Sequence, residues 1–293
     1  MAEGAAIRFF KRNLMEIIFL IPLLALVGTI TLYPIARSIY LAFLQSNNQI
    51  GLGNFQYVFH YQDVTTALIN TAFIVALALT MQFLISLLTA LLLNRSFFGR
   101  SFFRTVIMIP FGVATVVSGI MFTFLFTPSP QSWYLNSIIV KLGISNTGIN
   151  WIRPSWVAIL SLAIADSWKN FPLIMLILLG GLASIPASQY ESAAIDGANF
   201  LQQFRHITMP NLYPFIMMAV TIRAIQEFNI LALALVLVGS YPTFLGPLAY
   251  TTFTNYGIHD ANYASAIAMV LLGLISLFIL VYIAISRRLG MEV

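Results

Sequence analysis

Six long apolar segments limit what this chain can fold into more than any other feature of its sequence. They run over about 14–36, 67–93, 105–126, 154–182, 213–238 and 261–286. Each is long enough to cross a bilayer as a helix, which takes about 20 predominantly apolar residues. With 60% hydrophobic and 8% charged residues and a mean hydropathy of +0.91, the chain lies outside the range of soluble domains. We therefore predict an all-α polytopic membrane protein, in which residues 1–293 form one transmembrane domain of six helices.

The first apolar segment is predicted to be a retained span rather than a cleaved signal peptide. Its apolar run is longer than a signal-peptide core, and it ends in Tyr33 and Pro34 instead of a small-residue cleavage site. Both ends of the chain therefore lie on the same side of the membrane if all six segments cross it.

The basic residues give this arrangement a direction. The side with both termini and the second and fourth connections holds Arg8, Lys11, Arg12, Arg95, Arg100, Arg104, Arg205, Arg287 and Arg288. The other side holds Arg37, Lys141 and Arg153. The positive-inside rule then predicts cytoplasmic N and C termini. The same rule accounts for the net charge of +5, so the charge does not indicate nucleic-acid binding. The basic, aromatic stretch 94–104 is interpreted as a membrane-surface loop in preference to a short nucleic-acid patch.

The connection between the fourth and fifth segments is neither apolar enough to enter a bilayer nor loose enough to be a linker. Pro186 suits the first position of a short helix, and Gly197 suits its left-handed cap. Asn199 and Gln202 predict a capping box for a second short helix that runs towards His206, and we expect this second arm of the elbow to end at Pro210. The sequence thus predicts an elbow of two amphipathic helices.

A series of residues in this elbow matches a known motif. The series is Glu191, Ala193, Asp196, Gly197, Ala198, Ile207 and Pro210. It resembles the EAA motif, E-A-A-x-x-D-G-A and then I-x-L-P, of membrane subunits of ATP-binding-cassette importers. Ser192 replaces the first alanine and Met209 the leucine, and both changes are small. The alternative is an ordinary amphipathic loop helix of an unrelated membrane protein.

The resemblance implies that the elbow, residues 186–210, is a cytoplasmic coupling helix that sits in a cleft of an ATPase subunit. The residues implied to contact the ATPase are Glu191, Ala193, Asp196, Gly197, Ala198, Phe200, Phe204, Ile207 and Pro210.

Other stretches are similar to landmarks of the same family, in the same order. They are Tyr33-Pro34, 51–55, Asn70-Thr71, 91–95, 103–105, Ile109-Pro110, Trp168-Lys169, Phe171-Pro172 and 263–266. The likeness is greatest to the sugar-importer branch that contains the maltose-transporter permease, although 239–242 departs from that branch's Gly-Gly-Pro loop. It implies a non-catalytic permease subunit in a prokaryotic cytoplasmic (inner) membrane. Its implied partners are a second, homologous permease in a heterodimer, two ATPase subunits and an external solute-binding protein.

Charged side chains fall near the middle of the fourth and fifth segments. Asp166 and Lys169 lie about 18 Å or more from the start of the fourth helix, and Arg223 and Glu227 about 15 Å or more from the start of the fifth. An ionised residue at this depth costs about 2.5–3.5 kcal/mol on insertion scales. We therefore expect all four to face the bundle interior or a watery cavity.

Two interpretations of these charges stay open. In the first, Asp166 pairs with Lys169 and Arg223 with Glu227, and the pairs are structural. In the second, the polar residues line a cavity that suits a carbohydrate or a related polyol or glycoside. The pathway residues are then Asp166, Ser167, Lys169, Asn170, Arg223, Gln226 and Glu227. Disaccharide, oligosaccharide, glycosylated osmolyte and glycerol phosphate are all compatible with this polarity.

Other chemistry is not indicated. The chain has no cysteine, its three histidines (His60, His206 and His259) have no ligand-like spacing, and it has no G-x-x-x-x-G-K-[ST] loop. We predict no catalytic residue, metal or cofactor, and we expect ATP hydrolysis on separate subunits. The competing classes are an autonomous secondary carrier or channel and a membrane-embedded enzyme, neither of which explains the elbow.

Overall fold

The computed structural model describes residues 14–45, 47–126, 135–146, 148–153, 155–255 and 260–288. In these residues the structure is helical and contains no β-strand, apart from an isolated β-bridge between Leu44 and Ile50. The predicted all-α class is therefore confirmed. Five residues used in the sequence predictions lie outside the described residues, namely Arg8, Lys11, Arg12, Pro154 and His259.

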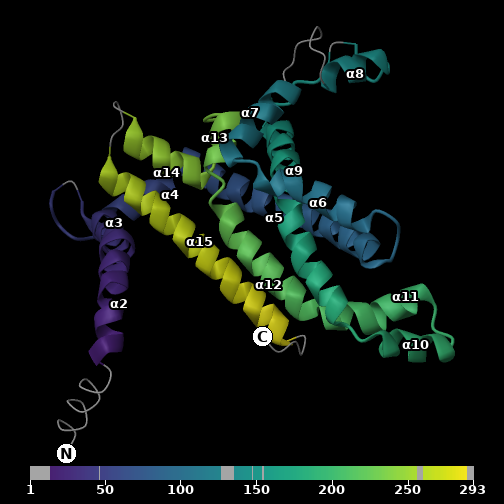
Figure 1. The fold of residues 1–293 in the computed structure, drawn as a ribbon. Coiled ribbons are helices and arrows are strands. Elements are labelled where there is room, and N and C mark those ends of the chain that lie inside the picture. Colours follow the sequence, from purple (N-terminus) through teal and green to yellow (C-terminus); the bar gives the residue numbers. More distant parts are fainter. Residues whose placement is uncertain are drawn as a thin grey trace, which may run out of the picture.

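The helices follow the apolar segments and their connections (Figure 1). In chain order they are α2 (Leu14–Val27), η1 (Gly28–Leu32), α3 (Tyr33–Phe43), α4 (Gly53–His60), α5 (Gln62–Asn94), α6 (Arg100–Gly112), α7 (Thr115–Leu125), α8 (Leu135–Lys141), α9 (Ser155–Ser184), α10 (Ala187–Ile195), α11 (Phe200–Gln203), η2 (Phe204–Thr208), α12 (Met209–Phe228), α13 (Ala232–Leu237), α14 (Leu245–Thr254) and α15 (Ala261–Arg288). The elements η1 and η2 are single π-helical turns.

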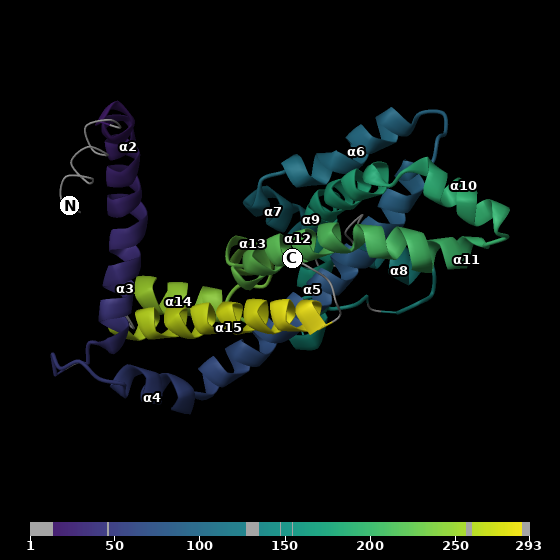
Figure 2. The ribbon, with the colours of Figure 1, turned by 90° about the horizontal axis from the view of Figure 1, so that it is seen from below.

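The long helices α5 and α9 form the centre of the bundle, and α12 packs against both (Figures 1 and 2). Two hydrophobic clusters lie along them. One, nearer α14, includes Ile74 and Leu162. The other, nearer α10, includes Leu178 and Leu212. Because lipid is as apolar as these side chains, such helices are held together by van der Waals packing and by hydrogen bonds between helices.

Close approach of α9 and α12 at the elbow end depends on Gly181. A Cβ atom at this position would lie 2.7 Å from ring atoms of Phe215 and 2.9 Å from a methyl carbon of Leu212. Small residues at helix interfaces allow backbones to approach in this way. The elbow is therefore mounted on two helices in direct contact.

Four described helices are long and apolar enough to cross a membrane, and a bent pair would make a fifth. The four are Ile18–Phe43, Gln62–Asn94, Ser155–Ser184 and Ala261–Arg288. The pair is α6 and α7, which cover the predicted span 105–126 but meet at an angle of 95°. The bend follows Pro110, which lies inside α6 near its end and cannot donate a backbone hydrogen bond.

The predicted span 213–238 also differs from the observed helices. α12 ends at Phe228, and the chain turns at Asn229 before α13 begins at Ala232. α13 then packs against α7. The apolar run conceals this turn, because its leucines and alanines suit either one long helix or two short ones. α12 itself contains Arg223 and Glu227 and is not among the helices that qualify as spans by length and composition.

The N-terminal part of the first span stands apart from the bundle in Figure 2, where α2 projects away from the other helices. α3, at its other end, packs against α15 and α4. In the 18-residue apolar window of Ile18–Phe43, none of the residues is buried within this chain. This span therefore offers its surface to lipid or to another protein.

Candidate functional site

The elbow begins with a helix that ends in a left-handed glycine. α10 starts after Pro186, and Gly197 has φ +78°. The amide of Gly197 donates to the carbonyl of Ala194 (3.1 Å), and the amide of Ala198 donates to that of Ala193 (2.9 Å). These two bonds are the Schellman motif, which reverses the chain after a helix. The predicted glycine cap is confirmed.

The second arm of the elbow begins with the predicted capping box. The Gln202 amide donates to Asn199 Oδ1 (3.0 Å), and the Asn199 amide donates to Gln202 Oε1 (2.8 Å). Each side chain thus satisfies a backbone donor that the first helical turn leaves free. The turn between the arms is fixed by local hydrogen bonds on both sides.

The prediction that the second arm ends at Pro210 is wrong. α11 continues through η2 into α12, and Pro210 occupies the first turn of α12. Proline cannot donate a backbone hydrogen bond to the preceding turn, and the π-turn Phe204–Thr208 lies directly before α12. The π-turn before it is closed by the Met209 amide, which donates to the carbonyl of Phe204. The second arm is consequently one continuous helical rod with α12.

One surface of the elbow packs on the bundle. Tyr190 and Ile207 pack against the hydrophobic cluster at this end of α9 and α12. The Tyr190 hydroxyl and Thr208 Oγ1 lie 3.0 Å apart, which joins the two arms. The guanidinium of Arg95, after α5, lies 5.9 Å from the ring centroid of Phe200. The elbow is held in a defined position relative to three helices of the bundle.

The tip of the elbow carries exposed apolar side chains. Ile195 is 87% exposed, Phe200 65% and Leu201 70%. Ile195 and Leu201 were not among the predicted contact residues, although both are apolar and close to Gly197. Exposed apolar side chains of this size, gathered on a protruding turn, are typical of a protein–protein contact.

The other predicted elbow residues surround the same turn. Glu191 and Asp196 are exposed, whereas Ala193 and Ala198 are half-buried. Ala193, Gly197, Ala198 and Ile207 help to line a hollow of about 320 Å³ between the two arms. The ring of Phe204 stacks on that of Phe200, with centroids 6.4 Å apart. Small residues thus leave room inside the elbow, and larger ones form its outer surface.

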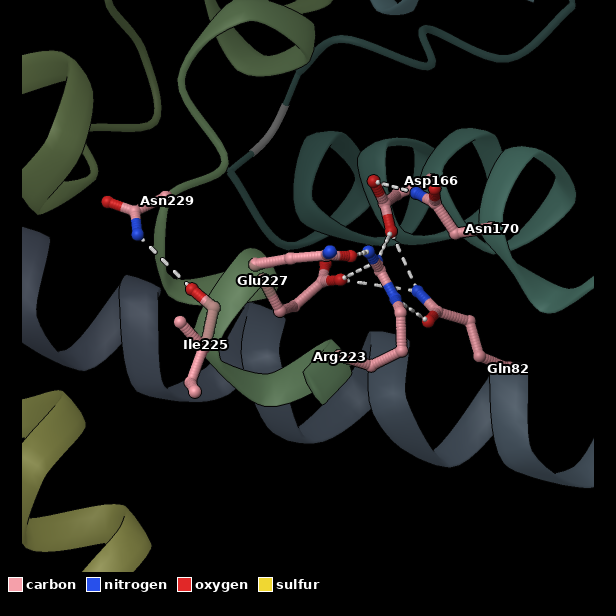
Figure 3. A network of polar contacts seen from close by, with 8 residues as sticks. Gln82, Asp166, Asn170, Arg223, Ile225, Glu227 and Asn229 are labelled. Carbon is pink, nitrogen blue, oxygen red and sulfur yellow. Dashed lines mark hydrogen bonds and ion pairs between the residues drawn. The ribbon is translucent and has the colours of Figure 1, made fainter. Parts of the chain in front are cut away.

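A second candidate site lies in the middle of the bundle, between the two hydrophobic clusters (Figure 3). Arg223 of α12 forms ion pairs with Asp166 of α9 (3.1 Å) and with Glu227 (2.6 Å), both through Nη2. Gln82 of α5 accepts a hydrogen bond from Arg223 Nε (3.0 Å) and donates to Asp166 Oδ2 (2.7 Å). The network therefore joins three helices through one guanidinium and one amide.

This pattern differs from the pairing considered from sequence. Arg223 pairs with Glu227 as expected, but the partner of Asp166 is Arg223 and not Lys169. The ammonium of Lys169 lies 5.8 Å from the ring centroid of Phe111, on α6. The spacing of residues along α9 suggested Lys169 as the partner of Asp166. It could not show that Arg223, on α12, lies close enough to pair with Asp166 instead.

Burial separates the candidate pathway residues. Asp166, Arg223 and Glu227 are 6%, 4% and 1% exposed, and Ser167, Lys169 and Asn170 are also buried. Gln226 is exposed, and its Oε1 accepts a hydrogen bond from Arg223 Nη1 (2.6 Å). Asn170 donates to Asp166 Oδ1 (2.8 Å). In this conformation the carboxyl groups and the guanidinium are buried, and Gln226 is the network's exposed member.

Gln82 is the network residue that the sequence predictions missed. It is fully buried and lies in the apolar segment 67–93. A buried amide in a span needs hydrogen-bond partners from other helices, because no water is available there. An amide side chain near the middle of a long apolar run was the available signal.

This chain is similar to known proteins in both sequence and fold. Residues 82–290 match the family described as "Binding-protein-dependent transport system inner membrane component". The chain is 29% identical over 280 residues to the trehalose/maltose transport system permease protein MalF of Thermococcus litoralis, covering 92% of each chain. It is 30% identical over 237 residues to a probable ABC transporter permease protein of Brucella abortus, covering 80% of this chain and 81% of the relative.

A solved structure shares the fold along nearly the whole chain. It is a chain in the crystal structure of a bacterial alginate ABC transporter in complex with an alginate pentasaccharide-bound periplasmic protein. The TM-score is 0.84 at 20% identity, and the match covers 98% of this chain and 99% of that one.

Proposed function

Because this chain belongs to the family of binding-protein-dependent transport system inner membrane components, we propose that it forms the membrane pathway of an ATP-driven importer for a carbohydrate or a related polyol or glycoside. The observation that carries this proposal is the elbow, which is fixed to the bundle on one surface and free on the other. An autonomous carrier has no need of such an element. ATP hydrolysis takes place on separate ATPase subunits, and this chain is not catalytic.

The elbow is the contact with an ATPase subunit. Its free tip offers apolar side chains around Gly197, and the hollow between its arms can accept side chains of a partner. Since the second arm is continuous with α12, a displacement of the tip moves α12 as a rod. Closure of the ATPase subunits would in this way displace Arg223 and Glu227, which lie on α12 in the middle of the bundle.

The wider assembly contains a second, homologous permease, two ATPase subunits and an external solute-binding protein. The projecting α2 supports the permease partner, because an apolar helix surface that its own bundle does not cover is available to a neighbouring chain. We propose a heterodimer of permeases in a prokaryotic inner membrane.

The carbohydrate class rests on the permease relatives and on the polarity of the central network. Within that network we propose different roles for the predicted pathway residues. Asp166, Arg223 and Glu227 act as a structural tie between α9 and α12, since each is buried and paired, and Gln82 extends the tie to α5. Gln226 is the residue that meets the solute, since its amide is exposed at the edge of the network.

Orientation and docking are tested together with single cysteines, because the native chain has none. Leu201→Cys places a thiol on the elbow tip, and Ile144→Cys, at a residue 67% exposed beyond α8, places one at the opposite end. With a membrane-impermeant maleimide, we expect intact cells to label residue 144 and inverted vesicles to label residue 201. Added ATPase subunits should slow the labelling at 201 about tenfold and leave 144 unchanged.

Two outcomes at these sites would contradict the proposal. Labelling of residue 201 from outside intact cells would contradict the orientation. Equal labelling rates at 201 with and without bound ATPase subunits, in complexes shown to be assembled, would contradict the docking role.

A further inference from the structure

A polar pocket of about 580 Å³ lies at the end of the bundle opposite the elbow. Its walls come from α4, α14 and the first turns of α5 and α15. The volume is within the range of small-molecule sites. Asp63, at its edge, precedes Gln82 by 19 residues of α5, or about 28 Å of helix. The pocket is therefore separate from the central network.

Three tyrosines form one wall of the pocket. The rings of Tyr57 and Tyr61 stack with centroids 5.8 Å apart, and the ring of Tyr263 stands edge-on to Tyr57 at 4.9 Å. Tyr57 is 58% exposed and Tyr61 44%, so ring surface remains open to a ligand. Aromatic rings with hydroxyl groups combine an apolar face with a hydrogen-bonding edge. This wall suits the alternating apolar and hydroxyl surfaces of a sugar ring.

The hydroxyl of Tyr263 is buried and has no hydrogen-bond partner among the described residues. A buried polar atom without a partner calls for a specific explanation, because leaving it unpaired is unfavourable. Tyr263 lines the pocket, so a ligand hydroxyl could supply the partner.

The remaining lining favours a neutral ligand with many hydroxyl groups. The polar wall residues include Asn54, Asn255, Asp63 and Asp260, and the described residues around the pocket include no lysine or arginine. Two carboxylates without a cation disfavour phosphate or carboxylate ligands. Amide and carboxylate oxygens accept hydrogen bonds from sugar hydroxyls.

We infer that this pocket is a second carbohydrate site, which holds a neutral sugar at the outer face before the sugar enters the membrane pathway. The inference rests on the proposed function for its outward orientation and for the class of ligand. It adds a site on the external surface, distinct from Gln226 and the central network.

The test measures protection of a cysteine by sugar. Asn255→Cys places a thiol in the pocket wall, and Ile144→Cys serves as the external control away from it. The assembled importer, without its binding protein, is labelled with maleimide in the presence of trehalose, maltose or glucose 6-phosphate. We expect trehalose or maltose at about 20 mM to slow labelling at 255 at least about threefold, as for a site of millimolar affinity. Glucose 6-phosphate should not protect, and residue 144 should be unaffected.

A second variant tests the buried hydroxyl. In the Asn255→Cys background, Tyr263→Phe removes one hydrogen-bonding group and keeps the ring, so the sugar concentration for half-protection should rise about fivefold. An unchanged half-protection concentration would show that the hydroxyl plays no part in binding.

Protection by neither disaccharide at residue 255 would overturn the site. If the same complex with its binding protein still takes up one of these sugars, the pocket inference alone fails. If it takes up neither of them nor any other carbohydrate, the proposed carbohydrate class fails as well.

Discussion

Replacing Gly197 by valine is expected to lower ATP-driven uptake about tenfold or more while leaving the chain inserted in the membrane. Gly197 has φ +78°, a conformation that costs a β-branched residue about 1–3 kcal/mol. A Cβ atom there would meet no heavy atom within 4 Å, so the added side chain projects into the space that an ATPase subunit would occupy. The substitution thus changes both the turn and the docking surface.

Gly197→Asn is the matched control. Asparagine adopts the left-handed conformation more readily than other residues with a side chain, so most of the turn geometry should survive. We expect Gly197→Asn to retain more assembly and uptake than Gly197→Val. Complex assembly, ATP hydrolysis and solute uptake should be measured on both variants in the same vesicles. A Gly197→Val protein that assembles and transports normally would refute the coupling role of the elbow.

Replacing Arg223 by glutamine is expected to destabilise the chain by about 3–5 kcal/mol, because the substitution leaves two buried carboxylates without their cation. Asp166 and Glu227 both accept a hydrogen bond from Arg223 Nη2, and the other donor that they share, the amide of Gln82, carries no charge. For a chain of this length the loss corresponds to a melting temperature lower by about 10 °C, measured on the purified protein in detergent.

The neutral triple variant distinguishes lost pairing from lost packing. Asp166→Asn and Glu227→Gln keep the sizes of those side chains, and together with Arg223→Gln they remove every charge of the trio. We expect the triple variant to regain most of the melting temperature, since replacing a whole buried ion pair is often close to neutral. A single Arg223→Gln variant that melts within about 2 °C of the native chain would contradict the structural tie.

Local sequence signals predicted the elbow well. Gly197 as a left-handed cap and Asn199 with Gln202 as a capping box involve residues a few positions apart, and the structure contains both features. The end of the second arm was not predictable in the same way. Pro210 is compatible with either a helix end or a first turn, and the π-turn before it decides between them.

Features that depend on distant residues were predicted less well. Arg223, the partner of Asp166, is 57 residues away in the sequence and lies on α12. Gln82, which also bonds to Asp166, lies on a third helix, α5. Apolar runs also conceal turns, so the sequence did not show the 95° bend between α6 and α7 or the break at Asn229. Hydropathy predicts that a segment enters the membrane, whereas packing against neighbouring helices decides where it bends.

The projecting first span follows the same logic. Its length and apolarity predicted a membrane helix, and the structure contains one. The exposure of its 18-residue apolar window could not be predicted from the sequence, because a helix that is apolar all round can face lipid, its own bundle or another chain.

Uptake into proteoliposomes tests the central proposal most directly. The vesicles should contain this chain with a second permease and the ATPase subunits, and they should be supplied with radiolabelled trehalose or maltose. We expect uptake to require both ATP on the ATPase side and the solute-binding protein on the other. Uptake by this chain alone, driven by an ion or solute gradient and indifferent to ATP, would contradict the proposal and identify an autonomous carrier.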